Sequence, residues 1–143
     1  MKIRTALLAV LALGVAAPIA SAKGRMDYKT FPISDVMKME ANQKYLGGFK
    51  FQFGGGGGAR INTTHTRSTD PRPFQSDESR CQRAFLNALI KVRKDAERQG
   101  GTGVVQIVTT STATGQPLKS TTEYACIAGG SNARVYLDGV IVK

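Results

Sequence analysis

A long apolar stripe in the second half of the chain limits the fold more than any other feature of the sequence. Its members recur at spacings of three and four residues: Cys81, Ala84, Phe85, Ala88, Leu89, Val92 and Ala96. This periodicity places them on one face of an α-helix. Ser76 is a favourable N-cap, Asp77 suits the first turn, and Gly100 ends the pattern. The stripe therefore predicts an amphipathic helix over residues 77–99 that lies against a sheet.

Strand patterns surround this helix. Alternating or β-branched residues predict strands at 49–53, 104–111, 121–128 and 133–142, the last interrupted at Asp138-Gly139. We expect the last three strands to form an antiparallel meander, with Tyr124 and Cys126 on one face.

The N-terminal part of the domain is expected to be helical. Ser34 is a candidate N-cap for a short helix over residues 35–45, which Gly47-Gly48 would end. Together the patterns predict a single α+β domain over residues 34–143, in which the long helix packs on a small, mainly antiparallel sheet.

The first 22 residues have the layout of a secretory signal peptide. Lys2 and Arg4 precede an apolar run, and Ala20-Ser21-Ala22 supplies the small residues after which a signal peptidase cuts. The run is well short of the ~20 residues that a membrane-spanning helix needs, and a retained membrane anchor is the alternative. We expect cleavage between Ala22 and Lys23, no lipid-modified cysteine, no membrane span after cleavage, and a periplasmic or secreted protein.

Two segments carry few apolar residues and are expected to lack regular structure. Residues 23–33 are predicted to be a loose lead-in. Residues 54–75 contain five consecutive glycines followed mainly by Thr, Ser, Asp and Pro, which predicts a long flexible loop. The glycines do not form a nucleotide-binding loop, because that motif needs G-x-x-x-x-G-K-[ST] before a helix, and Gly58 leads into Ala59-Arg60-Ile61. We expect no nucleotide and no cofactor.

Cys81 and Cys126 are the only cysteines. In an oxidising compartment such a pair is first interpreted as a disulfide. Closing a loop of about 45 residues would stabilise the fold by roughly 4 kcal/mol in the chain-entropy model. A working thiol is the alternative, but the two residues form no C-x-x-C motif and neither has a neighbouring His. A bridge would pin the start of the long helix to strand 121–128.

The chain is basic, with 20 Lys+Arg against 10 Asp+Glu, and removal of residues 1–22 lowers the formal net charge from +10 to +8. Cations gather on the predicted helix, where the dipole favours them near the C-terminus and a solvated face explains them. The alternative is a docking face for anions, formed by Arg80, Arg83, Lys91 and Lys94. Phe49-Lys50-Phe51 beside Arg60 offers aromatic rings for stacking on bases, although core packing also explains these rings.

Few residues suit catalysis or metal binding. His65 is the only histidine, and no nucleophile motif or oriented carboxylate lies beside it in the sequence. Its combination with Asp70 is one that any flexible loop can contain, and Glu123 is expected on the solvent face of its strand. One histidine and two bridged cysteines cannot supply a four-ligand zinc site. We therefore expect neither an enzyme nor a metal site.

Several spaced motifs resemble those of a family of small exported proteobacterial proteins. They are Pro32-Ile33, Phe51-x-Phe53-Gly54, residues 81–90 (CQRAFLNALI), Gln99-Gly100-Gly101, Val104-Val105, residues 122–126 (TEYAC) and residues 140–143 (VIVK). Many members carry the label of an excinuclease ATPase subunit, which these residues do not support because the phosphate loop is lacking. More distantly, the helix and strands resemble the small α+β domains of the Rcs envelope-stress sensor lipoprotein and of pentameric proteins named for heavy-metal binding.

These observations predict an exported, disulfide-tied envelope protein that is a non-catalytic binding or interaction module. In one form of this hypothesis the basic domain attracts lipopolysaccharide, anionic lipid or an acidic protein, and salt weakens the attraction. Nucleic acid is a less expected partner of an exported protein. In another form an envelope protein docks on the segment 54–75 or on an exposed strand edge. A metal-binding protein and an enzyme are the least favoured alternatives.

Overall fold

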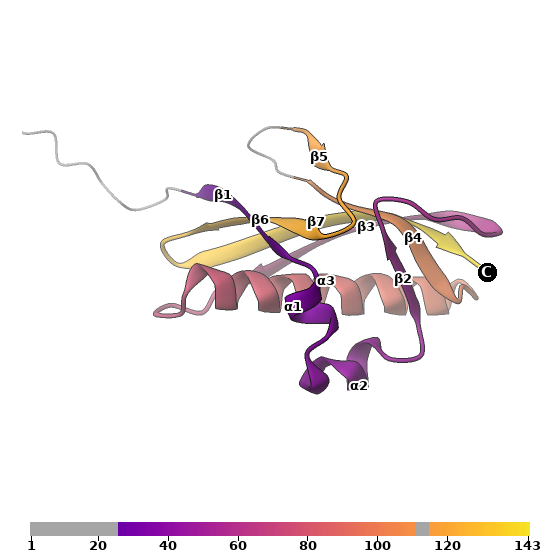
Figure 1. Cartoon of the computed structure of the whole chain (residues 1–143), viewed down its shortest axis with the longest axis horizontal. Coiled ribbons are helices and arrows are strands. Elements are labelled where there is room, and N and C mark those ends of the chain that lie inside the picture. Colours follow the sequence, from indigo (N-terminus) through magenta and orange to yellow (C-terminus); the bar gives the residue numbers. More distant parts are fainter. Residues whose placement is uncertain (1–25, 111–114) are drawn as a thin grey trace, which may run out of the picture.

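A computed structural model describes residues 26–110 and 115–143, so the predicted signal peptide and its cleavage site between Ala22 and Lys23 lie outside the described residues. One long helix, α3 (Asp77–Arg98), lies against one face of a curled sheet (Figure 1). The predicted α+β class and the helix over 77–99 are confirmed. Ser76 caps α3 as expected, because its hydroxyl accepts a hydrogen bond from the Ser79 N–H at 3.1 Å.

Across the described ranges, seven strands form one sheet: β1 (Asp27–Pro32), β2 (Lys50–Phe53), β3 (Arg60–Asp70), β4 (Gly103–Thr110), β5 (Pro117–Leu118), β6 (Glu123–Gly129) and β7 (Asn132–Val142). β7 pairs with β3 along one edge, and its other edge pairs first with β6 and then with β4. β1 pairs with β6, and β2 pairs in parallel with β4. The sheet is mainly antiparallel as predicted, but the expected meander is wrong, because β7 lies between β6 and β4.

β7 runs without a break through Asp138-Gly139, so the predicted interruption of this strand is wrong. Gly139 is buried opposite β4. A side chain at this position would place its Cβ 2.5 Å from a methyl carbon of Val104. Glycine therefore serves here to let two strands and the core approach closely, and it does not end the strand.

Both segments that were expected to be irregular contain a strand. Residues 27–32 of the predicted lead-in form β1, and residues 60–70 of the predicted loop form β3. The inward-facing residues of β3 include Thr64, Ser68 and Asp70, each at most 4% exposed. Because these residues are polar, no apolar alternation marks the strand.

The predicted helix over 35–45 is broken into α1 (Ser34–Met37), the 3-10 turn η1 (Glu40–Asn42) and α2 (Gln43–Leu46). Ser34 is the first residue of α1 and not its N-cap. The break falls at Met39, which has an extended backbone with ψ of 120°. The side-chain amide of Asn42 donates to the Val36 carbonyl at 2.9 Å, which satisfies a group left free at the end of α1. The segment consequently folds back beside α3.

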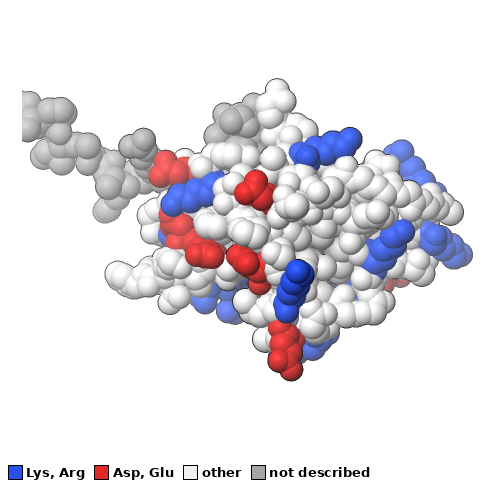
Figure 2. Space-filling view, viewed as in Figure 1, with Lys and Arg blue, Asp and Glu red and all other residues white. Residues whose placement is uncertain are grey.

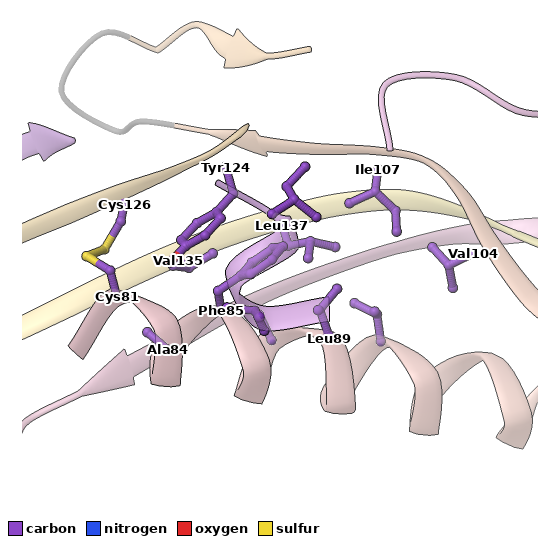
Figure 3. Packing of buried hydrophobic residues seen from close by; sticks show 14 of the residues in the cluster. Cys81, Ala84, Phe85, Leu89, Val104, Ile107, Tyr124, Cys126, Val135 and Leu137 are labelled. Carbon is purple, nitrogen blue, oxygen red and sulfur yellow. A yellow bond between two sulfur atoms is a disulfide. The ribbon is translucent and has the colours of Figure 1, made fainter. Parts of the chain in front are cut away.

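The core lies between α3 and the sheet (Figure 3). Phe85 of α3 stacks on Tyr124 of β6, with ring centroids 4.0 Å apart. The Cys81–Cys126 disulfide joins the same two elements, with an S–S distance of 2.08 Å, and confirms the predicted bridge (Figure 3). The start of α3 is thus fixed to β6 by a covalent bond and by aromatic packing.

Candidate functional site

Arg80 is the first of the four cations predicted to bind anions, and it is 3% exposed. Its guanidinium donates to the Asp77 carboxylate at 2.5 Å. It also donates to the carbonyls of Gly129 and Gly130 at 3.3 and 3.2 Å. Arg80 therefore fixes the turn between β6 and β7 to the start of α3. Its charge is buried and paired within the protein, and its role in anion binding stays a prediction.

Lys91 lies on the side of α3 that faces β3, together with Asp95 and Gln99, and we call these three residues the tether flank. Each hydrogen-bonds to β3: Lys91 Nζ donates to the Arg67 carbonyl at 2.9 Å, Asp95 Oδ2 accepts from Thr64 Oγ1 at 2.8 Å, and Gln99 Oε1 accepts from Asn62 Nδ2 at 3.0 Å. The outer edge of β3 has no strand partner in the part of the chain that the structure describes. The tether flank ties β3 to α3, and Lys91 satisfies one backbone carbonyl of this edge, that of Arg67.

Arg83 and Lys94 lie on another side of α3, beside the N-terminal helices. Two adjoining hollows of about 270 and 490 Å³ share Asn42, Arg83 and Leu86 and form one groove. We call it the α3 groove: its main apolar lining is Met39, Tyr45, Leu86 and Ile90, and its cations are Lys44, Arg72, Arg83 and Lys94. The four predicted cations are thus divided, with two of them in this groove and two outside it.

The positive charge of the groove is largely unpaired. Arg83 and Lys94 are exposed, and neither makes an ion pair or a hydrogen bond with a described residue. Eleven positions at about 1.5 Å each place them about 16 Å apart along α3. The Lys44 ammonium lies 4.8 Å from the centre of the Tyr45 ring. No acidic residue is among the described residues that line the groove, so no lining residue compensates the charges of Lys44, Arg83 and Lys94.

Arg72 lines the groove near the start of α3, but its charge is neutralised. Its guanidinium donates to the buried Asp70 carboxylate at distances from 2.7 to 3.0 Å. Burial raises the pKa of Asp70, but the hydrogen bonds from Arg72 and the charges of Arg72 and Arg83 outweigh burial and hold this pKa below its ordinary value. Asp70 is therefore an anion at neutral pH. Arg83 supplies the uncompensated charge at this end of the groove.

Arg93 holds the wall that α2 contributes to the groove. Its guanidinium donates to the carbonyls of Tyr45 and Gly47 at 3.0 and 2.7 Å, and it lies 5.3 Å from the centre of the Phe49 ring. These contacts fix the end of α2 against α3 and leave Tyr45 43% exposed. Sequence patterns do not identify these wall residues, because only the folding back of residues 39–46 brings them to α3.

His65 does not contact Asp70, although these two residues were considered as a pair in the sequence analysis. It pairs with Asp138 of β7, whose second carboxylate oxygen accepts from the Thr110 hydroxyl at 3.3 Å. Strand alternation places His65 on the sheet face away from α3, whereas Asp70 is on the other face. Glu123 is exposed, as predicted. In residues 26–110 and 115–143, no three His, Cys, Asp or Glu side chains gather in a way that could hold a metal ion.

The remaining predicted sites are structural. The Phe49 and Phe51 rings lie 4.9 Å apart and pack against the core, which favours the core interpretation over base stacking. Cys81 and Cys126 are 0% and 1% exposed, so their bridge is sheltered from solution thiols. A structural disulfide indicates an oxidising, extracytoplasmic compartment. Among the described helices, none has the length and apolar character to cross a membrane.

Charge is unevenly distributed over the molecule. Figure 2 shows acidic side chains gathered around β1 and the start of α3, while cations dominate the opposite end of the face shown. The positive net charge is therefore not spread as one uniform binding face. The α3 groove is distinguished by its unpaired cations, Arg83 and Lys94, and by its apolar lining, and not by net charge alone.

Comparison of the chain with protein-family models, with curated proteins and with solved structures found no match. The resemblance to small exported proteins consequently stays a prediction, and the groove is interpreted from its own geometry.

Proposed function

We propose that this protein is an exported, non-catalytic binding module that holds an anionic amphiphile in the α3 groove. The carrying observation is that two unpaired cations, Arg83 and Lys94, lie about 16 Å apart along α3, with apolar Leu86 and Ile90 between them in the groove. Cationic side chains bind phosphate or carboxylate, and apolar side chains gain free energy by covering an acyl chain. Anionic lipid and lipopolysaccharide combine both kinds of group.

The compartment supports this ligand class. The signal peptide predicted at residues 1–22 and the buried Cys81–Cys126 bridge favour a periplasmic or secreted protein, which meets such amphiphiles. The resemblance to small exported envelope proteins favours the same compartment. An acidic envelope protein is the other candidate for the groove, and it would not require the apolar lining.

A direct test compares two soluble single-chain amphiphiles that differ in charge. Calorimetry would measure the binding of the oxidised protein, without residues 1–22, to lysophosphatidylglycerol and lysophosphatidylcholine below their critical micelle concentrations. We expect saturable binding of the anionic amphiphile that persists at physiological salt, because the acyl chain contributes a term that salt does not screen. Binding of the zwitterionic amphiphile should be roughly ten-fold weaker.

Two charge-matched variants decide whether the groove is responsible. Arg83→Glu with Lys94→Glu should weaken binding of lysophosphatidylglycerol roughly ten-fold. Lys119→Glu with Lys143→Glu changes the net charge by the same amount at exposed positions outside the groove, and should leave the affinity unchanged. Equal losses in the two variants would attribute the binding to net charge and contradict the proposed site.

A further inference from the structure

The linker between β3 and α3 carries the most exposed large apolar side chain among the described residues. Phe74 is 102% exposed, whereas the next four such residues are 39% to 43% exposed. Single, partly exposed apolar residues are normal on protein surfaces and need no function. Phe74 differs from them because its entire ring is in solvent and takes no part in the core.

The backbone at Phe74 is strained. Its φ is 63°, in the left-handed region that bulky side chains rarely adopt and that raises the free energy of the folded state. Only Gln106 shares a positive φ among the non-glycine residues that the structure describes. The left-handed backbone and the exposure of an apolar ring to water each raise the free energy of the folded state. Backbone outliers of this kind concentrate at binding sites.

The linker is anchored on both sides of the ring. Before Phe74, Pro71 and Pro73 restrict the backbone, and the Arg72 N–H donates to the Asp70 carboxylate at 3.1 Å. After it, the hydroxyl of Ser76 caps α3. The exposure of the ring is therefore a feature of an anchored turn.

Phe74 belongs to a linker that borders the α3 groove. Arg72 and Ser79, which precede and follow it in the chain, both line the groove together with Arg83. Figure 1 shows this linker as a loop that extends past the start of α3, at one extremity of the molecule. The apolar tip thus lies beside the Arg83 end of the groove, at an end of the molecule where acidic side chains also gather (Figure 2).

We propose that Phe74 is a membrane anchor, which inserts into the interface of an anionic bilayer so that the α3 groove takes its amphiphile from the bilayer surface. An apolar insertion combined with cations is what holds peripheral proteins to anionic membranes. Acidic side chains, among them exposed Glu78, gather around β1 and the start of α3 at the same end, so charge alone does not direct this end to the membrane and the ring is required. The inference rests on the proposed function for the identity of the ligand.

The fluorescence of a single introduced Trp reports on its own position alone, because the chain contains no Trp. Phe74→Trp would be titrated with vesicles of phosphatidylglycerol and phosphatidylcholine, and with vesicles of phosphatidylcholine alone, at physiological salt. We expect a blue shift of the Trp emission, and quenching by brominated acyl chains, with the anionic vesicles only. Ile61→Trp places the reporter at another exposed apolar position, at the far end of β3, and its emission should not shift.

A second variant separates the anchor from the groove. Phe74→Ser should weaken cosedimentation with anionic vesicles roughly ten-fold, and should leave binding of soluble lysophosphatidylglycerol unchanged. If soluble amphiphile binds while the emission of Phe74→Trp stays solvent-like with vesicles, the anchor is overturned and the groove stands. Insertion of the indole without binding of the soluble amphiphile would support the anchor and contradict the groove. A blue shift that depends on protein concentration without vesicles would overturn the anchor in favour of a second copy of the chain.

Discussion

The tether flank and the groove side of α3 carry similar residue types but differ in what those residues contact. Lys91, Asp95 and Gln99 each have a hydrogen-bond partner on β3. Arg83 and Lys94 have none among the described residues. The difference arises because β3 presents polar side chains and one backbone carbonyl to α3, whereas the N-terminal helices present Met39 and Tyr45. A cation on a helix is therefore structural or available for binding according to the element beside it.

The tether flank and the groove side both depend on the position of α3, which the disulfide fixes. Removal of the disulfide therefore gives the largest expected effect on stability. Replacing Cys81 and Cys126 by Ala should lower the free energy of unfolding by about 4 kcal/mol, because the 45-residue separation no longer restricts the unfolded chain. Urea denaturation monitored by circular dichroism would measure this loss. Reduction of the native protein in denaturant should give the same value, and a loss below about 1 kcal/mol would show that packing alone holds α3.

The second prediction compares how much stability is lost when a buried cation and an exposed cation on the same helix are replaced. Arg80→Met should cost about 2–3 kcal/mol, because the Gly129 and Gly130 carbonyls lose their donor and Asp77 loses one of two cations. Arg83→Met should stay within about 0.5 kcal/mol, as expected for an exposed unpaired residue. Denaturation of both variants under one set of conditions checks this, and equal costs would contradict the division of the predicted cations.

The parts of the fold with a strong apolar signal could be predicted from the sequence. The stripe of α3 and the position of Cys81 on it are confirmed, as are the alternation of Tyr124 and Cys126 and the exposure of Glu123. These features depend on apolar residues that must be buried, and burial imposes a fixed period.

The missed parts depend on polar groups or on long-range pairing. β3 carries buried Thr64, Ser68 and Asp70, so its inner face has no apolar pattern; its β-branched threonines were the one local signal for a strand. The position of β7 between β6 and β4 is set by pairing between distant segments. Because residues 60–70 form a strand, deletion of residues 55–74 would remove part of the sheet and could not test them as a docking loop.

The same reasoning explains why only half of the candidate site was predicted. The sequence predicts Arg83 and Lys94 as part of one docking face, but it does not separate them from Arg80 and Lys91. That separation requires the partners of each cation, and these partners come from the turn at Gly129 and from β3.

Acidification should weaken the tether flank through Asp95. The hydrogen bond from Thr64, together with Gln99 and Arg98, holds the pKa of Asp95 below its ordinary value. The folded state thus binds its proton less readily than the unfolded chain does, and the stabilisation is present above the unfolded pKa of about 3.9 and is lost as pH falls below it. The lowered pKa values of Asp70 and Asp77 have the same sign.

Asp95→Asn isolates this contribution. The variant should lose about 1 kcal/mol at neutral pH and should show a shallower loss of stability between about pH 5 and 3 than the native protein. Denaturation measured over this pH range gives both quantities. An unchanged slope would mean that Asp95 is not linked to folding through its hydrogen bond with Thr64.

Within the tether flank, the smallest effect on stability is expected at Lys91, where the main consequence is association between chains. Lys91→Ala should cost about 0.5–1 kcal/mol, because the Arg67 carbonyl returns to water. The variant also uncovers part of the β3 edge, and an uncovered strand edge pairs with other chains. Sedimentation velocity should therefore detect concentration-dependent dimers of Lys91→Ala, whereas Lys94→Ala, which removes the same charge from the groove, should remain as the native protein. If Lys94→Ala associates and Lys91→Ala does not, the groove is the surface protected from self-association, and the contrast between the two sides of α3 is reversed.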